Sequence, residues 1–196
     1  MELWDVLDED GNLTGRTIER GQPLKDGEYH LVVNIWIKNS KGEYLIQKRS
    51  EKVERWSGIW AATGGSAIKG ENSLNAALRE VKEELGISLK PDMLKRVIGV
   101  KRKNALSDLW LACHDVDLKD IRVQKEEVSE VKYASMSEIL IMTSSNEFLD
   151  YGEDYMRLLK DSESEKFIRR IKTADPKETQ LIMAKVTGNF KHGNER

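Results

Sequence analysis

The chain contains 196 residues, of which 39% are hydrophobic and 34% are charged, and its 32 basic and 34 acidic side chains leave a formal net charge of −2. This composition is typical of a soluble globular protein, and the balanced charge gives no support for a general nucleic-acid or membrane-surface binder. The longest apolar run, residues 109–113, is too short to span a bilayer. The opening residues lack the pattern of a secretion signal and the single cysteine excludes an intramolecular disulfide, so we expect a cytoplasmic protein without nucleic-acid or membrane partners.

The first half of the chain predicts strands followed by one helix. The turn dipeptide Asp10-Gly11 separates two apolar arms, which is typical of a hairpin. β-Branched and aromatic residues favour strands on both sides of a turn at 39–42. Gly86 is a helix stop signal. The predicted elements are, in chain order, a hairpin over 3–15, paired strands over 30–38 and 43–49, a short apolar stretch over 57–62 and a helix over 72–85.

The second half predicts further strands and then a change in composition. The expected elements are strands over 97–101, 109–116 and 130–134, and a short helix over 135–142 capped by Ser135 or Ser137. Beyond about residue 145, polar helices are predicted over 147–160, 163–172 and 176–186. We expect a mixed α/β domain over 1–145 and a helical extension over 146–196, which could cover the domain, form a dimer contact or hang loosely.

The predicted helix over 72–85 has two distinct faces. At about 100° per residue, Glu80, Glu83 and Glu84 cluster about 140° away from the apolar face. That apolar face comprises Leu74, Leu78, Val81 and Leu85. The helix can therefore bury one side while it presents three carboxylates on the other.

The three carboxylates are locally unfavourable. Glu80 forms like-charge pairs with Glu83 and Glu84, each of which costs about 0.2–0.5 kcal/mol. Glu83 and Glu84 also lie in the last turn, where the helix dipole favours cations. A divalent cation would remove this conflict, and oxygen donors favour Mg²⁺, Mn²⁺ or Ca²⁺. The alternative is that the face is solvated, as many glutamate-rich faces are.

The spacing around the helix resembles the signature of the Nudix hydrolase family at nine positions. Chance would give this spacing with a probability on the order of 10⁻⁷ in a chain of this length. The nine matching positions are Gly65, Glu71, Arg79, Glu80, Val81, Glu83, Glu84, Gly86 and Ile87.

The resemblance implies a fold and an activity. The fold is an α/β/α sandwich with a mixed sheet, to which this chain would add the N-terminal hairpin and the helical extension. The activity is hydrolysis of a nucleoside diphosphate linked to another moiety, or of a related diphosphate, with Mg²⁺ or Mn²⁺. A bound divalent ion neutralises phosphate charge, polarises the P–O bond and lowers the pKa of bound water. Homodimers are common in the family, so a homodimer is possible here.

The resemblance also assigns roles to individual residues. Glu80, Glu83 and Glu84 match the metal-binding glutamates, and a backbone carbonyl at Gly64 or Gly65 matches an additional ligand. Arg79 matches an arginine that orients a neighbouring glutamate, for which Glu83 is one sensible partner. The roles implied for Glu71 and Gly86 are structural.

The general base in this family varies and can lie outside the signature. The candidates here are Glu126, Glu127 and Glu130, which precede a predicted strand. We choose Glu127 because a family glutamate often lies several residues before an aromatic residue, as Glu127 precedes Tyr133. The alternative is a solvated acidic loop.

A second, less specific resemblance extends over residues 2–142 and points to the family branch that includes isopentenyl diphosphate isomerase. It rests on residues 4–9, 29–31, 47–50 and 56–60. Gly64 stands where the isomerase has its catalytic cysteine, and His30 matches one of its metal-binding histidines while two others are replaced by Pro23 and Ser66. We therefore expect hydrolase chemistry, with an isomerase or a non-catalytic nucleotide-binding module as alternatives.

Four residues that precede the signature are candidates for substrate binding. Lys48 and Arg49 end a strand and could meet phosphates, with an ordinary solvated strand end as the alternative. Trp56 and Trp60 could stack on a flat group, although core or lid packing would also explain them. We expect His30 to be a satisfied structural histidine and Cys113 to be a small core residue. The small-molecule diphosphate itself is not identified by these residues.

Overall fold

The computed structural model describes residues 2–161, and its backbone divides into two compact units, Met1–Leu149 and Asp150–Arg196. The division falls between Leu149 and Asp150, whereas composition placed the boundary after residue 145. The helices predicted over 163–172 and 176–186 lie outside the described residues. No helix in the described part of the chain is long and apolar enough to cross a membrane.

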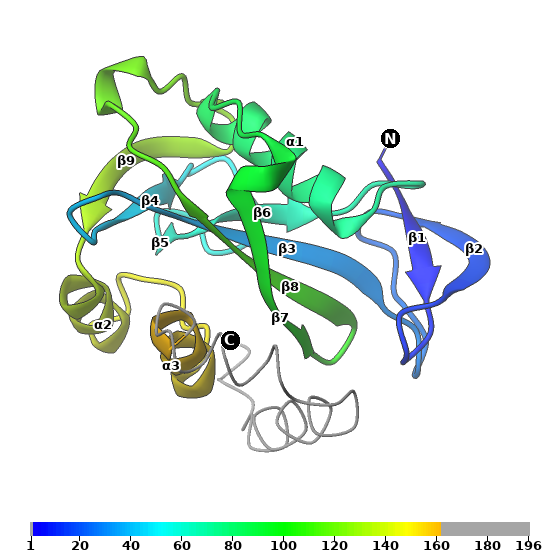
Figure 1. The fold of residues 1–196 in the computed structure, drawn as a ribbon. Helices are drawn as coiled ribbons and strands as arrows, with labels where there is room; N and C mark the ends of the chain where they lie inside the picture. Colours follow the sequence, from blue (N-terminus) through cyan, green and yellow to red (C-terminus); the bar gives the residue numbers. More distant parts are fainter. Residues whose placement is uncertain (1, 162–196) are drawn as a thin grey trace. The chain divides into compact units, whose positions relative to one another are not determined.

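The first unit contains two β-sheets (Figure 1). A separate hairpin comprises β1 (Leu3–Leu7) and β2 (Leu13–Glu19). The seven strands of the main sheet are β3 (His30–Lys38), β4 (Tyr44–Arg49), β5 (Trp60–Ala61), β6 (Thr63–Ser66), β7 (Leu94–Lys101), β8 (Ala105–Cys113) and β9 (Val128–Ala134). The helices are α1 (Ser73–Leu85), α2 (Met136–Ser144) and, in the second unit, α3 (Glu153–Asp161), with 3-10 turns at Pro91–Met93 and Leu118–Asp120.

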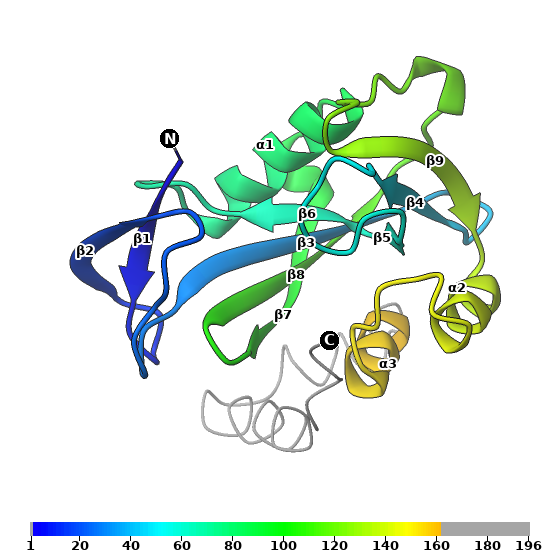
Figure 2. The same ribbon diagram turned by 180° about the vertical axis from the view of Figure 1, so that it is seen from behind.

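The main sheet is mixed, as predicted. Strand β3 pairs with β8 in parallel and with β4 and β6 antiparallel, and the central order is β5-β4-β3-β8-β7. Strands β3 and β4 pair directly only at Ile37–Leu45 and Lys38–Tyr44. Farther along they separate, and β5 pairs with β4 while β6 pairs with β3 (Figure 2). The short strands β5 and β6 thus lie in the opening between two longer strands.

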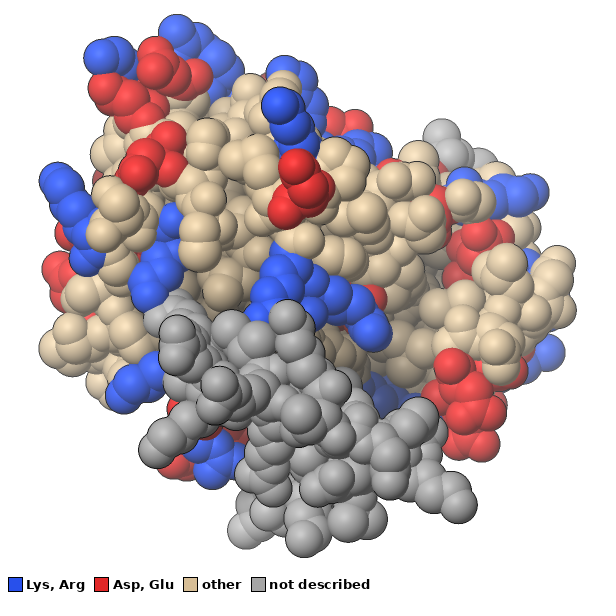
Figure 3. Space-filling view, viewed as in Figure 1, with Lys and Arg blue, Asp and Glu red and all other residues tan. Residues whose placement is uncertain are grey.

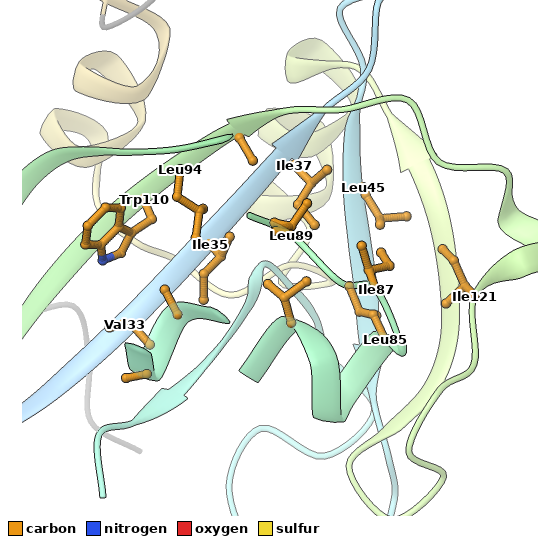
Figure 4. Close-up of a cluster of buried hydrophobic side chains, with 14 of the residues drawn as sticks. Val33, Ile35, Ile37, Leu45, Leu85, Ile87, Leu89, Leu94, Trp110 and Ile121 are labelled. Carbon is orange, nitrogen blue, oxygen red and sulfur yellow. The ribbon is translucent and has the colours of Figure 1, made fainter. Parts of the chain in front are cut away.

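The core lies between the sheet and α1 (Figure 4). Alternate residues of a strand point to opposite faces, and β3 accordingly contributes Val33, Ile35 and Ile37 to this core. Helix α1 contributes the buried residues Val81 and Leu85, which were predicted for its apolar face. Leu74 and Leu78 are partly buried against the same cluster. The predicted apolar face of the helix is therefore confirmed.

Both ends of α1 are determined by local sequence. The side chain of Asn72 accepts a hydrogen bond from the backbone N–H of Asn75, which caps the first turn. Gly86 adopts a left-handed conformation with φ 71°, and its N–H donates to the carbonyl of Lys82. Glycine adopts this conformation without the strain that a Cβ would cause. The predicted stop at Gly86 is confirmed.

Some predicted bounds were too short, since the hairpin extends to Glu19 instead of residue 15 and β7 begins at Leu94 instead of residue 97. In three further elements, backbone pairing overrides the local pattern. Strand β6 was not predicted, since two of its four residues are glycines, and its pairing with β3 makes it a strand. The helix predicted over 147–160 begins only at Glu153. The N–H of Trp60 donates to the carbonyl of Glu147 at 2.9 Å, and the carbonyl of Trp60 accepts the N–H of Leu149 at 2.8 Å. Residues 147–149 therefore run beside β5.

The third difference concerns the strand that contains Cys113. Strand β8 covers Ala105–Cys113 instead of 109–116, because residues 105–108 pair with the beginning of β3. Cys113 therefore lies at the end of the strand and is exposed. The expectation that it belongs to the core was wrong. The N-cap of α2, by contrast, is Ser135, one of the two predicted candidates.

Candidate active site

Two of the three glutamates on α1 are buried, which corrects the expectation that the helix presents all three away from its buried side. Glu80 is 9% exposed and Glu84 is 4% exposed. The side chain of Glu83, in contrast, is 52% exposed. The difference arises because the sheet covers part of the acidic face of α1, so that Glu80 and Glu84 lie against β6.

Glu84 is held by β4 and β6 together. Its Oε2 accepts hydrogen bonds from Gln47 Nε2 at 2.8 Å and from the backbone N–H of Gly64 at 3.2 Å. Gln47 in turn accepts a bond from the hydroxyl of Thr63 at 3.0 Å. Gln47 is 1% exposed. Sequence reasoning did not assign Gln47 to the site. The available signal was a neutral polar residue directly after the apolar residues that begin β4.

Arg79 links the remaining acidic residues. Its Nη1 donates to both Glu80 Oε1 and Glu83 Oε2 at 2.9 Å. Its Nη2 donates to the Ser66 carbonyl at 3.0 Å, and Nε and Nη2 both contact the Glu71 carboxylate. Glu83 was predicted as one partner of Arg79. The structure shows this contact, and Arg79 also binds the carboxylates of Glu71 and Glu80. Glu71 also accepts the N–H of Ile68 at 3.1 Å, so it ties the loop before α1 to Arg79.

Burial changes the proton affinity of the two inner carboxyls. Desolvation raises the pKa of Glu80 to about 7, although the adjacent Arg79 opposes the shift. Desolvation also raises the pKa of Glu84 to about 8, and the charge of Glu80 adds to this rise. The hydrogen bonds from Gln47 and Gly64 and the charge of Arg49 act in the other direction. Two like charges in a buried site are therefore costly near neutral pH unless a cation joins them.

The glycines of β6 allow α1 and β3 to come close. A Cβ on Gly64 would lie 2.2 Å from the carbonyl oxygen of Val33, and a Cβ on Gly65 would lie 2.3 Å from Glu80 Oε1. Gly65 is therefore in direct contact with one inner carboxylate, while Gly64 binds the other. This is the stretch whose carbonyls were expected to contribute to a metal site.

We expect Gly64→Ala and Gly65→Ala to affect stability differently. In Gly64→Ala the new methyl group meets backbone, which cannot move without disturbing β3, and we expect a loss of about 1–3 kcal/mol in the free energy of unfolding. In Gly65→Ala the methyl group meets the end of a side chain that can rotate, so the loss should be smaller, while Glu80 is displaced. Urea unfolding measures both variants, and equal losses would contradict this account.

The three candidates for the general base lie in or beside β9. Glu126 and Glu130 are exposed, and Glu126 pairs with Lys52 at 3.8 Å. Glu127 is partly buried, and its backbone carbonyl accepts the N–H of Ser50 at 2.8 Å. The same segment is joined to α1, because Gln124 N–H donates to the Glu84 carbonyl at 3.0 Å. Of these three residues, Glu127 is the one that is partly buried.

The four candidates for substrate binding do not lie together at one place on the sheet. Arg49 is close enough to Glu84 for its charge to lower the pKa of that carboxyl. Lys48 follows Gln47 in β4 and faces the other side of the sheet by strand alternation. Trp60 pairs with Lys48 in register, is 8% exposed and lies under Lys132 Nζ. Trp56 is 55% exposed and has a φ of 53° in the loop between β4 and β5.

The donor set of this site fits a hard divalent cation, although no cage is preformed. Within residues 2–161, no group of three His, Cys, Asp or Glu side chains stands ready to hold a metal ion. Arg79 holds Glu80 and Glu83, while Gln47 and Gly64 hold Glu84. The available donors are carboxylates and carbonyls, which Mg²⁺ and Mn²⁺ prefer. A bound divalent cation would offset the charges of the two buried carboxyls, whose pKa values are raised.

Comparison with known proteins gives consistent results. Residues 28–152 match the model of the NUDIX domain family. The chain is 42% identical over 152 residues to an uncharacterized Nudix hydrolase of Listeria monocytogenes, covering 77% of this chain and 90% of that protein. It is 31% identical to an isopentenyl-diphosphate Delta-isomerase of Pectobacterium atrosepticum, over 71% of this chain and 80% of that protein. A crystal structure of DR0079 from Deinococcus radiodurans shares the fold, with a TM-score of 0.67, 18% identity and coverage of 83% and 100%.

Proposed function

The chain belongs to the Nudix hydrolase family, and from this premise we propose that it hydrolyses a pyrophosphate bond in a divalent-metal-dependent reaction. The substrate would be a nucleoside diphosphate linked to another moiety, or a related diphosphate. The observation that carries the proposal is the pair of buried carboxyls, Glu80 and Glu84, beside Gly65 and Gly64. A helix selected for stability alone would not bury two like charges in its last turns.

The metal would be held by Glu80, Glu83, Glu84 and a carbonyl of Gly64 or Gly65. When bound, Mg²⁺ or Mn²⁺ neutralises phosphate charge, polarises the P–O bond and lowers the pKa of a bound water. Arg79 orients Glu80 and Glu83 through one shared nitrogen, and Gln47 orients Glu84. These residues fix the carboxylates on a rigid helix and so reduce the reorganisation that the reaction requires.

Two further residues complete the proposed site. Glu127 would accept the proton of the attacking water, since its segment is bonded to both β4 and α1. Arg49 would bind a phosphate oxygen, since its charge already acts on Glu84 and its guanidinium suits phosphate geometry. Trp56 is available for a flat substrate group because its side chain is exposed. Lys48, in β4, and Trp60, its partner in β5, lie on the other face of the sheet, which supports a role in the sheet.

The positions of Gly64 and Cys113 argue against the isomerase alternative. Gly64 stands where that reaction requires a cysteine, and Cys113 lies at the end of β8 beside Lys38. The relation to the isomerase therefore points to shared ancestry of the fold with a different site. A binding module without activity would have no need for the buried carboxyl pair.

The direct test of the proposed function is a panel assay. Phosphate and pyrophosphate release would be measured from nucleoside diphosphates and triphosphates, nucleotide sugars, dinucleotides and prenyl diphosphates, with Mg²⁺, with Mn²⁺ and with EDTA. Release that requires a divalent ion supports the proposal, and the best substrate identifies the class. Double-bond migration in a prenyl diphosphate would favour the isomerase, and binding of nucleotides without any turnover would favour the module.

We expect the stability of the metal-free protein to depend on pH through Glu80 and Glu84. Their pKa values in the folded protein are raised, to about 7 and about 8, above the ordinary value of 4.5. The folded state therefore keeps protons that the unfolded state loses, and the stability contributed by protonation declines as pH rises from about 5 to about 8. Mg²⁺ competes with these protons, so the rise in Tm on adding Mg²⁺ should be larger at pH 8 than at pH 6.

Differential scanning fluorimetry in EDTA and in Mg²⁺ measures this effect. The control is a Glu80→Gln, Glu84→Gln double variant, which should lose both the Mg²⁺ shift and this part of the pH dependence. A Mg²⁺ shift that is equal at pH 6 and pH 8 in the native chain would contradict the assignment.

A further inference from the structure

The N-terminal hairpin is hydrogen-bonded to the loop that leads from β6 to α1. The carboxylate of Asp5, in β1, accepts the N–H of Gly70 at 2.6 Å. The carbonyl of Leu3, in the same strand, accepts the N–H of Lys69 at 2.7 Å. The loop extends from β6 toward β1 before it turns into α1 (Figure 1). Strand β1 therefore holds two successive N–H groups of this loop, although the hairpin lies outside the family match at 28–152.

The same loop carries Glu71, which binds Arg79 on α1. Glu71 Oε2 accepts the N–H of Ile68 at 3.1 Å, and the N–H of Glu71 donates to the carbonyl of Ile68 at 3.0 Å. These two bonds close residues 68–71 into a turn, and Gly70 lies inside it with a φ of 79°. A shift of Gly70 would therefore carry the Glu71 carboxylate with it and change its contact with Arg79.

Arg79 connects the position of the loop to the carboxylates of the candidate metal site. Its Nη2 is held by both ends of the loop, through the Ser66 carbonyl at 3.0 Å and Glu71 Oε2 at 2.9 Å. Its Nη1 donates to Glu80 and Glu83, each at 2.9 Å. The guanidinium is a rigid plane, so its two ends cannot be oriented independently. A continuous series of hydrogen bonds therefore leads from the hairpin to two of the carboxylates.

The hairpin is attached to the main sheet independently of this loop. Leu7 and Tyr29 exchange two backbone hydrogen bonds, at 2.8 and 2.9 Å. The indole of Trp4 stacks on the imidazole of His30, the first residue of β3, with ring centroids 4.2 Å apart. These contacts give Asp5 a defined position from which to hold the loop.

His30 contributes to this attachment through the face of its ring. Its buried Nδ1 has no hydrogen-bond partner among residues 2–161, which corrects the expectation of a satisfied structural histidine. Burial lowers the pKa of its imidazole to about 4, and the charge of Arg55 adds to the shift, so the ring is neutral at pH 7. By strand alternation it lies on the sheet face opposite Val33, which packs against α1. The stack with Trp4 therefore attaches the hairpin and does not face the carboxyls.

We propose that Asp5 is a positioning residue for the candidate metal site, because it holds the loop whose Glu71 orients Arg79. The inference rests on the proposed function and adds to the site a hairpin that lies outside the family match. A carboxylate forms a short, strong hydrogen bond with a backbone N–H. Replacing a residue that orients metal ligands typically lowers metal affinity about 10–100-fold. Asp5 acts through two further side chains, so its replacement should have an effect at the lower end of this range.

Two measurements on the full chain test this proposal without a substrate. Hydrogen exchange of the Arg79 Nε–H, assigned by comparison with Arg79→Lys, reports whether Glu71 still holds the guanidinium. Mn²⁺ binding at pH 8, followed by electron paramagnetic resonance, reports whether the carboxylates are still oriented. In Asp5→Ala we expect the exchange rate to rise about tenfold and the Mn²⁺ affinity to fall about tenfold. Asp5→Asn keeps an acceptor oxygen without its charge, so both effects should be about threefold, and this variant carries the test if Asp5→Ala does not fold.

Asp8→Ala is the matched control, because the Asp8 carboxylate accepts the N–H groups of Asp10 and Asn12 within the turn of the same hairpin. It should leave the Arg79 exchange rate and the Mn²⁺ affinity at the native values, and urea unfolding establishes that each variant is folded. An unchanged exchange rate or Mn²⁺ affinity in Asp5→Ala, or an equal loss in Asp8→Ala, would overturn the proposal. Mn²⁺ binding by the native chain without turnover in the panel refutes only the hydrolase, whereas turnover together with native Mn²⁺ affinity in Asp5→Ala refutes only this proposal.

Discussion

Glu84→Gln should lower turnover by about 10³-fold while the fold is retained. The carboxylate of Glu84 is the more buried of the inner pair and is bound by both Gln47 and Gly64. Glutamine keeps the size of the side chain and one oxygen that accepts the same two hydrogen bonds. It lacks the negative charge that would hold a divalent ion, and an electrostatic contribution of about 4 kcal/mol corresponds to about 10³-fold in rate.

The same substitution should leave the metal-free protein at least as stable as the native chain. At pH 8 a buried charge beside Glu80 is removed, so the unfolding free energy in EDTA should stay level or increase. Glu9→Gln is the matched control, because the Glu9 side chain is 71% exposed in the turn of the hairpin, beside Lys101. Native-like turnover in Glu84→Gln would contradict the central role of this residue.

Arg79→Met should produce the second large effect, on stability and on metal use together. Arg79 is 21% exposed and binds Glu71, Glu80 and Glu83. Removal of the cation leaves three carboxylates without their partner, and loss of one member of a buried ion pair costs about 3 kcal/mol or more. Because Glu80 and Glu83 also lose their orientation, turnover should fall by about 10²-fold.

Arg79→Lys separates charge from geometry. Lysine keeps the positive charge but lacks the planar fork that contacts several acceptors at once. We expect it to recover part of the stability in urea unfolding, while the Mg²⁺ concentration required for half-maximal activity stays above that of the native chain. If Arg79→Met unfolds at the same urea concentration as the native chain and requires no more Mg²⁺, Arg79 does not position these carboxylates.

Local sequence was sufficient to predict the ends and the apolar face of α1. Asn72 and Gly86 act on neighbours within four residues, and Val81 and Leu85 follow helical periodicity. The burial of Glu80 and Glu84 could not be predicted in this way. It depends on β6, a strand that contains two glycines and forms only because β3 lies beside it. Periodicity describes one helix and does not show which neighbour covers its polar side.

The residues around the signature show the same limit. Arg49 and Lys48 are adjacent in sequence, yet strand alternation separates them onto two faces of β4, and only Arg49 acts on Glu84. Gln47 belongs to the less specific resemblance over residues 47–50, but its contact with Glu84 becomes visible only when β4 and α1 are together. Cys113 is exposed because β8 ends there. Each of these facts is a consequence of pairing between segments far apart in the chain.

One face of the molecule carries charges of both signs. On the face in Figure 3, Lys and Arg are interspersed with Asp and Glu over the described residues. The positive charges that matter to the proposed reaction are individual ones near the carboxyls, Arg79 and Arg49.

A Mn²⁺ titration followed by electron paramagnetic resonance tests the central claim most directly. Free Mn²⁺ gives a strong signal that weakens on binding, so the measurement needs neither a substrate nor turnover. At pH 8 we expect saturable binding by the native chain and by Glu9→Gln, and binding at least about tenfold weaker in Glu84→Gln. Equal binding by the native chain and Glu84→Gln, or none by the native chain, would contradict the assignment of Glu80, Glu83 and Glu84 as a metal site.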